Sequence, residues 1–281
     1  MSKINTLIKD VYDLLSTKGW YTEALAKETA DEINKRIFKQ YNELPSAGTL
    51  RLSKMGEWCP RALWYSVHHP ELAEPLPPWA NFKYSYGHVI EALAIALAKA
   101  AGHTVTGEQD EIILDGVKGH RDCIIDSNLV DVKSCSGFMF QKFKSKTISQ
   151  DDTFGYLAQL DGYLCGSSDE SLLTNKDTAF IWAIDKTLGK MVIYEHRRRE
   201  DFIRQRIAEY KDVVGKEHPP ECECGTIKHG ASGNIKLDTR ASYSAYKHSC
   251  FPNLRTFLYA DGPLFLTHVE RTPDVPELSR P

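Results

Sequence analysis

The run GHRDCIIDSNLVDVKS, residues 119–134, contains the pattern that decides the expected fold. Two apolar stretches, over 117–125 and 129–134, are expected as β-strands, and the polar turn signal at 126–128 separates them. A turn this short makes the two strands antiparallel neighbours. Asp122 lies near the middle of the first strand, while Asp131 and Lys133 are two residues apart on the second and share a face. The turn can therefore bring Asp122 close to Asp131 and Lys133.

The acidic residues of this hairpin are of a type that binds metal ions. Two carboxylates that converge from adjacent strands suit a hard divalent cation such as Mg²⁺ or Mn²⁺. A lysine beside them can orient a water molecule or stabilise charge on a transferring phosphoryl group. His88 and Glu91, one turn apart on a helix expected over 86–101, share a face and could supply further ligands. The alternative for Asp131 and Lys133 is an ion pair on the solvent side of a strand.

The remaining segments place this hairpin in a mixed architecture. An amphipathic helix pair is expected before residue 45, and further helices over 53–66, 86–101, 154–165 and 200–214, with a proline-rich loop at 70–79. Strands are expected over 104–114, 117–125, 129–134, 178–185 and 191–196. We therefore expect an α+β fold with α/β/α layers, in which helices flank a central mixed sheet of about five strands. The expected organisation is an N-terminal helical segment (1–50), a core (51–218) and a loop-rich C-terminal appendage (219–281) packed on the core.

Composition and charge exclude several classes of protein. The 281 residues are 42% hydrophobic and 26% charged, which is ordinary for a globular chain and unlike a disordered or collagen-like one. The formal net charge of −3 excludes a protein that coats nucleic acid by bulk charge, but not one with a local basic surface. The longest apolar run, near 92–101, contains Lys99 and is too short to span a bilayer. Charges interrupt the first apolar stretch, so we expect no secretory signal and a cytoplasmic location.

Four short motifs in order carry a resemblance to a known family. The segments YGHVIE (86–91), GHRD (119–122), DVKS (131–134) and QLDGY (159–163) resemble the PD-(D/E)XK nuclease superfamily, in its RecB-type exonuclease branch. That branch includes CRISPR-associated and phage-encoded exonucleases. The resemblance covers about residues 50–215 and implies a restriction-endonuclease-like core. The implied site residues are Glu91, Asp122, Asp131 and Lys133 for catalysis; Glu91, Asp122, Asp131, the backbone carbonyl of Val132 and His88 for metal binding; and Gln159 and Tyr163 for holding the DNA backbone or supporting the site.

The activity that the resemblance implies is that of a metal-dependent DNA exonuclease of phage or prokaryotic origin, working in DNA recombination, repair or degradation. One or two Mg²⁺ or Mn²⁺ ions would lower the pKa of a bound water and clamp the scissile phosphate. Lys133 would position the attacking water. DNA is the implied partner, with no membrane, and a second copy of the chain or a recombination protein stays open. A phage-encoded protein would work in the host cytoplasm.

Basic residues in two places support a DNA-binding surface. Lys142 and Lys144 follow the catalytic strand, interleaved with the phenylalanines at 138, 140 and 143. Arg197, Arg198 and Arg199 lie where the expected hairpin meets the next helix. Contacts from such residues to phosphates would position a strand without reading its sequence. The alternatives are a solvated helix face for the arginines and core packing for the phenylalanines.

The seven cysteines fall into two groups. Cys123, Cys135 and Cys165 lie inside apolar segments, where we expect small buried side chains. The other four, at polar junctions, are Cys59, Cys222, Cys224 and Cys250.

The resemblance raises the question of an iron–sulfur cluster, because several RecB-type nucleases hold one with a cysteine before the core and three after it. Cys59 matches the leading position, but Ala241 and Ser244 stand where later cysteines are expected. Three interpretations stay open. The cluster has been lost, or the four cysteines hold a cluster or Zn²⁺ in a rearranged way with His248 as a substitute ligand, or the thiols are free.

Two functions of other classes compete with the exonuclease. A non-catalytic DNA-binding or partner-binding protein could retain the nuclease fold, although the four catalytic residue types are all present. A sequence-specific restriction-type endonuclease is less favoured, since nothing in the sequence resembles a separate module that reads bases.

Overall fold

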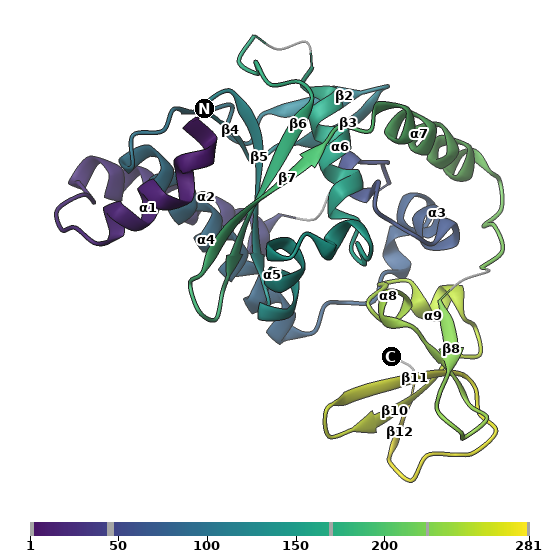
Figure 1. Cartoon of the computed structure of the whole chain (residues 1–281). Helices are drawn as coiled ribbons and strands as arrows, with labels where there is room; N and C mark the ends of the chain where they lie inside the picture. The colour runs from purple at the N-terminus through teal and green to yellow at the C-terminus, as the bar shows by residue number, and fades with distance from the viewer. Residues whose placement is uncertain (1–2, 44–47, 169–170, 223–224, 280–281) are drawn as a thin grey trace.

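The computed structural model describes residues 3–43, 48–168, 171–222 and 225–279. It has an α+β fold in which helices cover both faces of a five-stranded mixed sheet, as expected from the sequence (Figure 1). The strand order is β1-β4-β5-β6-β7, with β5 and β6 parallel and the other pairs antiparallel. In Figure 1 this sheet is seen nearly edge-on, with α1, α2 and α4 on one side and α6 and α7 on the other.

The elements of this core have the following bounds. The helices are η1 (Lys3–Thr6), α1 (Leu7–Leu15), α2 (Glu23–Asn42), η2 (Leu52–Lys54), α3 (Pro60–His68), η3 (Pro70–Leu72), α4 (Pro78–Ala100), α5 (Gly137–Lys144), η4 (Thr147–Ser149), α6 (Tyr156–Gly166) and α7 (Glu200–Gly215). The strands are β1 (Val105–Thr106), β2 (Glu111–Leu114), β3 (Val117–His120), β4 (Cys123–Ile125), β5 (Asn128–Cys135), β6 (Thr178–Asp185) and β7 (Met191–Arg197).

The central strands are buried on both faces. One apolar cluster lies between the sheet and α1 and α4, and a second lies between the sheet and α5, α6 and α7. On β5, Val130 and Val132 belong to the first cluster, and Cys135 belongs to the second. An alternating strand pattern is therefore misleading here, because the side opposite the valines faces protein and not water.

The strand expected over 117–125 is in fact two strands in different sheets. β3 pairs with β2 in a separate hairpin, β4 pairs with β1 and β5, and the chain changes sheet at Arg121 and Asp122. Arg121 is 1% exposed, and its guanidinium donates hydrogen bonds to the Gly107 carbonyl at 3.1 Å and to Ser167 Oγ at 3.2 Å. A buried guanidinium needs such partners, and they hold the chain away from a continuous strand. The expected strand over 104–114 is divided in the same way into β1 and β2.

Two expected helix boundaries are wrong, and prolines account for both. Helix α4 begins at Pro78, about two turns before residue 86, because a proline at the first helical position lacks only a hydrogen bond that the helix does not need there. The helix expected from Ser53 instead begins at Pro60, with the Cys59 thiol accepting a hydrogen bond from the Ala62 amide at 3.4 Å.

Beyond residue 225 the chain forms a second sheet where mainly loops were expected. Its strand order is β12-β10-β11-β9-β8, all antiparallel (Figure 1). The elements are β8 (Thr226–Lys228), β9 (Ile235–Leu237), α8 (Thr239–Ser242), α9 (Lys247–Cys250), β10 (Arg255–Tyr259), β11 (Gly262–His268) and β12 (Glu277–Leu278). Most of these strands are too short for a clear hydrophobic period. Across the described residues, no helix is long and apolar enough to cross a membrane.

A contact between two glycines joins the segment before α3 to the start of α6. A Cβ atom at Gly155 would lie 2.1 Å from Gly56 Cα, and one at Gly56 would lie 2.4 Å from Gly155 Cα. Gly155 also has a φ of +70°, which favours glycine. Both backbones must therefore remain free of side chains for α6 to sit where it does.

We predict that Gly155→Ala loses about 1–3 kcal/mol more unfolding free energy than Gly189→Ala, because a new methyl group would push two backbones apart. Gly189 is a matched control, since its φ is +67° and nothing lies within 4 Å of its Cβ position. Urea unfolding of both variants measures the difference. Equal losses would show that the backbone contact is not tight.

Candidate active site

The charged pair at the centre of the site lies on β5. Lys133 Nζ is 3.0 Å from Asp131 Oδ1 and 2.9 Å from Oδ2. Asp131 is 3% exposed, so the solvent-exposed ion pair considered for the sequence is ruled out. Asp131 Oδ2 is buried and, among the described residues, accepts no hydrogen bond of good geometry, although Nζ lies near it.

Asp122 joins this pair from the break between β3 and β4. Its Oδ2 accepts a hydrogen bond from the Val132 amide at 2.8 Å, which holds the carboxylate against β5 between Asp131 and Lys133. The approach expected from the sequence is therefore present. It arises from a break in the strand, since Asp122 lies just outside β4 and its side chain turns onto the neighbouring backbone.

Glu91 lies on α4 and is held by two residues that sequence reasoning missed. Arg36 Nη1 on α2 is 2.5 Å from Glu91 Oε1, and Gln109 Nε2 donates to the same oxygen at 2.9 Å. Arg36 is 9% exposed and also binds Glu32 at 2.7 Å. No sequence signal pointed to this arginine, because it lies far from Glu91 along the chain and α2 and α4 meet only in the folded protein.

Glu91, Asp122 and Asp131 together form what we call the carboxylate site, and burial and like charge raise the pKa of Glu91 and of Asp131. Burial raises the pKa of Glu91 to about 8, helped by the nearby charge of Asp122. Burial also raises the pKa of Asp131 to about 7, opposed by Lys133 and helped by Asp122. For Lys133, burial alone would lower the pKa, but Asp131 and Asp122 outweigh it and raise the pKa. Lys133 therefore stays protonated next to Asp131 and Asp122.

The donors of the carboxylate site are suited to a hard cation. All are oxygen atoms, which Mg²⁺ and Mn²⁺ prefer, and one of them, Asp131 Oδ2, is buried with Lys133 Nζ at 2.9 Å and no well-aligned hydrogen bond from the described residues. The three carboxylates do not all lie within 4.8 Å of one another. Mg²⁺ usually keeps several waters and few carboxylates, so the residues present fit such an ion.

Gln159 and Tyr163 lie one turn apart on α6, next to the ammonium group of Lys133. Gln159 Nε2 donates to the Tyr163 hydroxyl at 2.7 Å, and Lys133 Nζ lies 3.5 Å from Gln159 Oε1. Lys133 also lies 5.5 Å from the centre of the Tyr156 ring. Tyr163 is 4% exposed, and burial raises its pKa to about 12. This geometry favours support of the site over contact with DNA.

His88 is half-buried on α4 at the side of Arg36. Burial lowers the pKa of its imidazole, and the positive charge of Arg36 lowers it further. A neutral imidazole can bind a metal, but its ring nitrogens do not form a close group with three ligands of the carboxylate site.

The predicted DNA-binding residues do not form one free basic surface. Arg199 binds the fully buried Asp161, with Nε at 2.8 Å from Oδ2, and the same carboxylate contacts His196 Nε2 at 2.7 Å. Arg198 lies 3.5 Å from Glu200, and Lys142 is paired with Asp151 at 2.5 Å. Lys144 and Arg197 are exposed. Of the phenylalanines, 140 and 143 are buried and 138 is 72% exposed.

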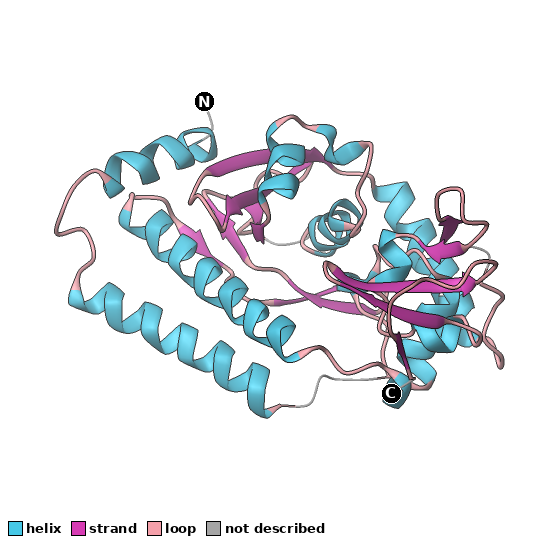
Figure 2. Cartoon of the chain, turned by 90° about the horizontal axis from the view of Figure 1, so that it is seen from below, coloured by secondary structure: helices cyan, strands magenta, loops and turns pink. Residues whose placement is uncertain are grey.

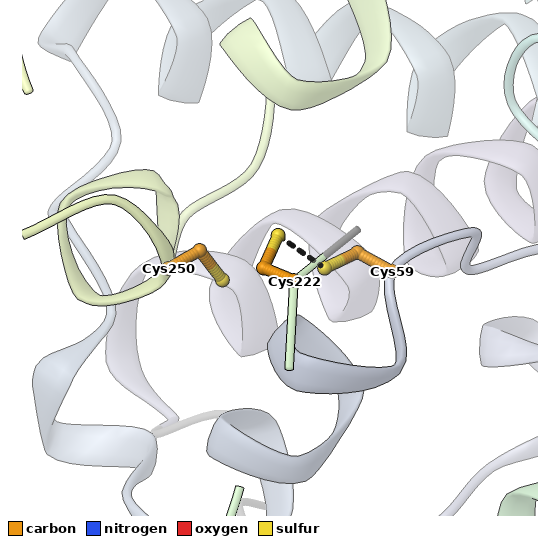
Figure 3. Close-up of side chains that lie close together, drawn as sticks. All are labelled: Cys59, Cys222 and Cys250. Atoms are coloured by element: carbon orange, nitrogen blue, oxygen red, sulfur yellow. Dashed lines mark hydrogen bonds between the residues drawn. The ribbon is translucent and has the colours of Figure 1, made fainter. Parts of the chain in front are cut away.

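The cysteines before and after the core meet in space. Figure 3 shows the thiols of Cys59, Cys222 and Cys250, which together form the cysteine cluster, pointing toward one another. The three sulfur atoms all lie within 4.8 Å of one another, and Cys59 Sγ is 3.6 Å from Cys222 Sγ. Cys224 lies outside the described residues. As expected, Cys123, Cys135 and Cys165 are buried.

The chemistry of the cysteine cluster suits a thiophilic metal. A hydrogen bond with Cys250 lowers the pKa of the Cys59 thiol to about 6, although burial works against it, and the pKa of Cys250 is raised. His248 does not belong to this close group of thiols, and its Nδ1 lies 2.5 Å from Glu74 Oε1. Ala241 is fully buried against Leu237 and Leu254 in a separate apolar cluster.

Comparison with known proteins finds likeness only at the level of structure. No protein-family model matches the chain, and no curated protein does. Similar solved structures include SSO0001, with 15% identity over 79% of this chain and 95% of that one and a TM-score of 0.42. They also include the alkaline exonuclease LHK-Exo from Laribacter hongkongensis, with 11% identity, 60% and 87% coverage and a TM-score of 0.36. The same exonuclease in complex with dAMP has the same identity and coverage and a TM-score of 0.42. All three TM-scores lie below 0.5.

Proposed function

We propose that the protein is a metal-dependent deoxyribonuclease, and more narrowly a DNA exonuclease. The observation that carries this proposal is the buried carboxylate site with Lys133 held directly against Asp131. Burial, together with the nearby charge of Asp122, raises the pKa of Glu91 and of Asp131, and among the described residues Asp131 Oδ2 accepts no hydrogen bond of good geometry. A divalent cation would favour the charged forms of these acids and offset the repulsion between them.

The residues divide the work of phosphodiester hydrolysis. Glu91, Asp122, Asp131 and the backbone carbonyl of Val132 would hold Mg²⁺ or Mn²⁺, and the bound ion would lower the pKa of a water and offset charge on the phosphate. Lys133 keeps its proton and donates hydrogen bonds to a phosphate oxygen or to the attacking water. Gln159 and Tyr163 fix the lysine in place.

The finer parts of the proposal come from the motif resemblance. They are exonuclease action on DNA, a phage or prokaryotic origin, a role in recombination, repair or degradation, and work in the cytoplasm. One observation favours the alternative of a non-catalytic binding protein with the same fold. Glu91 is already paired with Arg36, so this acid must leave the arginine or share its charge before it can hold a cation.

We predict that Asp122→Asn and Lys133→Ala each lower the rate of cleavage of linear DNA at least about 100-fold, because each removes a group that stabilises charge in the transition state. The assay uses end-labelled linear and circular DNA with Mg²⁺, Mn²⁺ or EDTA, and Lys9→Ala, which replaces an exposed lysine on α1, is the control. Loss of linear DNA only, dependent on metal, supports an exonuclease. Cleaved circles would indicate an endonuclease, and retained binding without cleavage would indicate the binding protein.

We predict different consequences for neighbouring arginines. Replacing both Arg197 and Arg198 with glutamine should weaken DNA binding. It should also lower the salt slope, by which we mean the magnitude of the slope of the logarithm of the binding constant against the logarithm of the salt concentration, by about 0.9 for each phosphate that these side chains neutralise. Arg199→Gln should instead cost about 1–3 kcal/mol of unfolding free energy, because buried Asp161 loses a partner. Salt-dependent binding and urea unfolding separate the two effects. An unchanged salt slope in the double variant would make that pair a solvated face.

We propose further that the cysteine cluster holds zinc or an iron–sulfur cluster. A tetrahedral site needs a fourth ligand, and Cys224 follows Cys222 by two residues in the sequence. The role would be structural, because the metal would tie the start of α3, where Cys59 lies, to the segment after the core that contains Cys222 and Cys250.

We predict that anaerobically purified protein contains bound zinc or iron and that Cys250→Ser loses this metal together with thermal stability, because one thiolate ligand is removed. Elemental analysis measures the content, and visible absorption distinguishes an iron–sulfur cluster from colourless zinc. Cys165→Ser is the control, as this buried thiol lies in the main core. A parent protein free of both metals would leave three unrelated thiols.

A further inference from the structure

The first half of α4 presents three aromatic side chains to solvent. Trp79, Phe82 and Tyr86 are 64%, 60% and 46% exposed. Their spacing of three and four residues places them on one face of the helix, and the Phe82 and Tyr86 rings are 5.1 Å apart. We call these residues the aromatic face. Exposed aromatic groups gathered in this way are unusual on a protein without a partner.

Packing against α2 does not explain the aromatic face. Helices α2 and α4 lie side by side, as Figure 2 shows, and they meet through other positions of α4. Gln40 Nε2 donates to the Asn81 carbonyl at 2.7 Å, and the Tyr41 and Ser85 hydroxyls are 3.1 Å apart. The three aromatic side chains stay largely exposed beside this contact.

Two lysines beside the aromatic face repel each other. Lys83 follows Phe82 directly and is exposed, and its side chain contacts that of Lys186 in the turn between β6 and β7. Burial lowers the pKa of Lys186, and the charge of Lys83 lowers it further. Within the described ranges neither ammonium group forms an ion pair with a carboxylate. Two convergent cations without an acid suit a bound anion.

The lysine pair also adjoins the strand that carries the catalytic residues. The Lys186 amide donates to the Cys135 carbonyl at 3.1 Å, at the end of β5 and two residues after Lys133. Phe138, which is 72% exposed, follows at the start of α5. A nucleic-acid strand that left the carboxylate site along β5 would thus meet Lys186 and Lys83 before it reached the aromatic face.

We propose that the aromatic face and the pair Lys83 and Lys186 bind single-stranded DNA next to the active site. Bases stack on Trp79, Phe82 and Tyr86, and a phosphate lies between the two ammonium groups. Exposed aromatic rings beside cations are how proteins hold unpaired strands, whereas the bases of a duplex are already stacked on one another. The choice of DNA as the polymer rests on the proposed nuclease function.

The test measures binding of a fluorescent oligothymidylate by anisotropy in EDTA, so that no cleavage is needed. We expect Phe82→Ala to bind roughly 5- to 150-fold more weakly, the loss typical of one stacked base. Phe38→Ala is the matched control, because Phe38 is 61% exposed on α2 and Phe82 is 60% exposed. Replacing Lys83 and Lys186 with glutamine should lower the salt slope by about 0.7 for each phosphate that the pair neutralises. Thermal unfolding confirms that the exposed variants stay folded.

Equal binding by Phe82→Ala and Phe38→Ala would overturn the inference. If Phe82→Ala leaves binding unchanged but converts a dimer to a monomer in sedimentation, the aromatic face is instead an interface with a second copy. The nuclease assay and this binding test can fail independently of each other. If the protein does not cleave DNA but its binding depends on Phe82, the single-strand binding site is supported and the nuclease function is not. If the protein cleaves DNA but its binding does not depend on Phe82, only the nuclease function is supported.

Discussion

The ion pair between Asp131 and Lys133 is the interaction on which the rest of the site depends. Both charges lie on β5, a strand covered by helices on its two faces, where Asp131 is buried and the Lys133 side chain is only 20% exposed. Burying a charge is costly unless a partner of opposite sign and further hydrogen bonds offset the loss of water. Gln159 near the lysine and Asp122 on the adjoining backbone amide supply part of that compensation.

The remaining acid is balanced from a different part of the chain. Arg36 on α2 carries its charge to Glu91 on α4, so the helix pair before the core is coupled to the electrostatics of the site. Even so, Glu91 and Asp131 keep raised pKa values, and no described residue donates a well-aligned hydrogen bond to Asp131 Oδ2. A core selected for stability alone would satisfy these groups, and their imbalance is typical of sites kept for function.

Helix α4 links several of these features because it changes character along its length. Its second half is buried against the sheet, its middle carries Glu91, and its first half exposes the aromatic face. The cysteine cluster brings Cys59 at the start of α3 to Cys250 in α9. The cysteine cluster thus joins segments that lie far apart in the sequence.

The sequence by itself determined the α+β class, the hairpin that brings Asp122 to Asp131 and Lys133, and the helical spacing of Gln159 and Tyr163, because these depend on local periodicity and short turns. It did not predict the early start of α4, the break at Asp122 or the strands beyond residue 225. Only the tertiary structure decided that β5 is buried on both faces, that Arg36 pairs with Glu91 and that Cys222 meets Cys59. Contacts of this kind join distant segments, and their energies come from burial and charge, which no local pattern records.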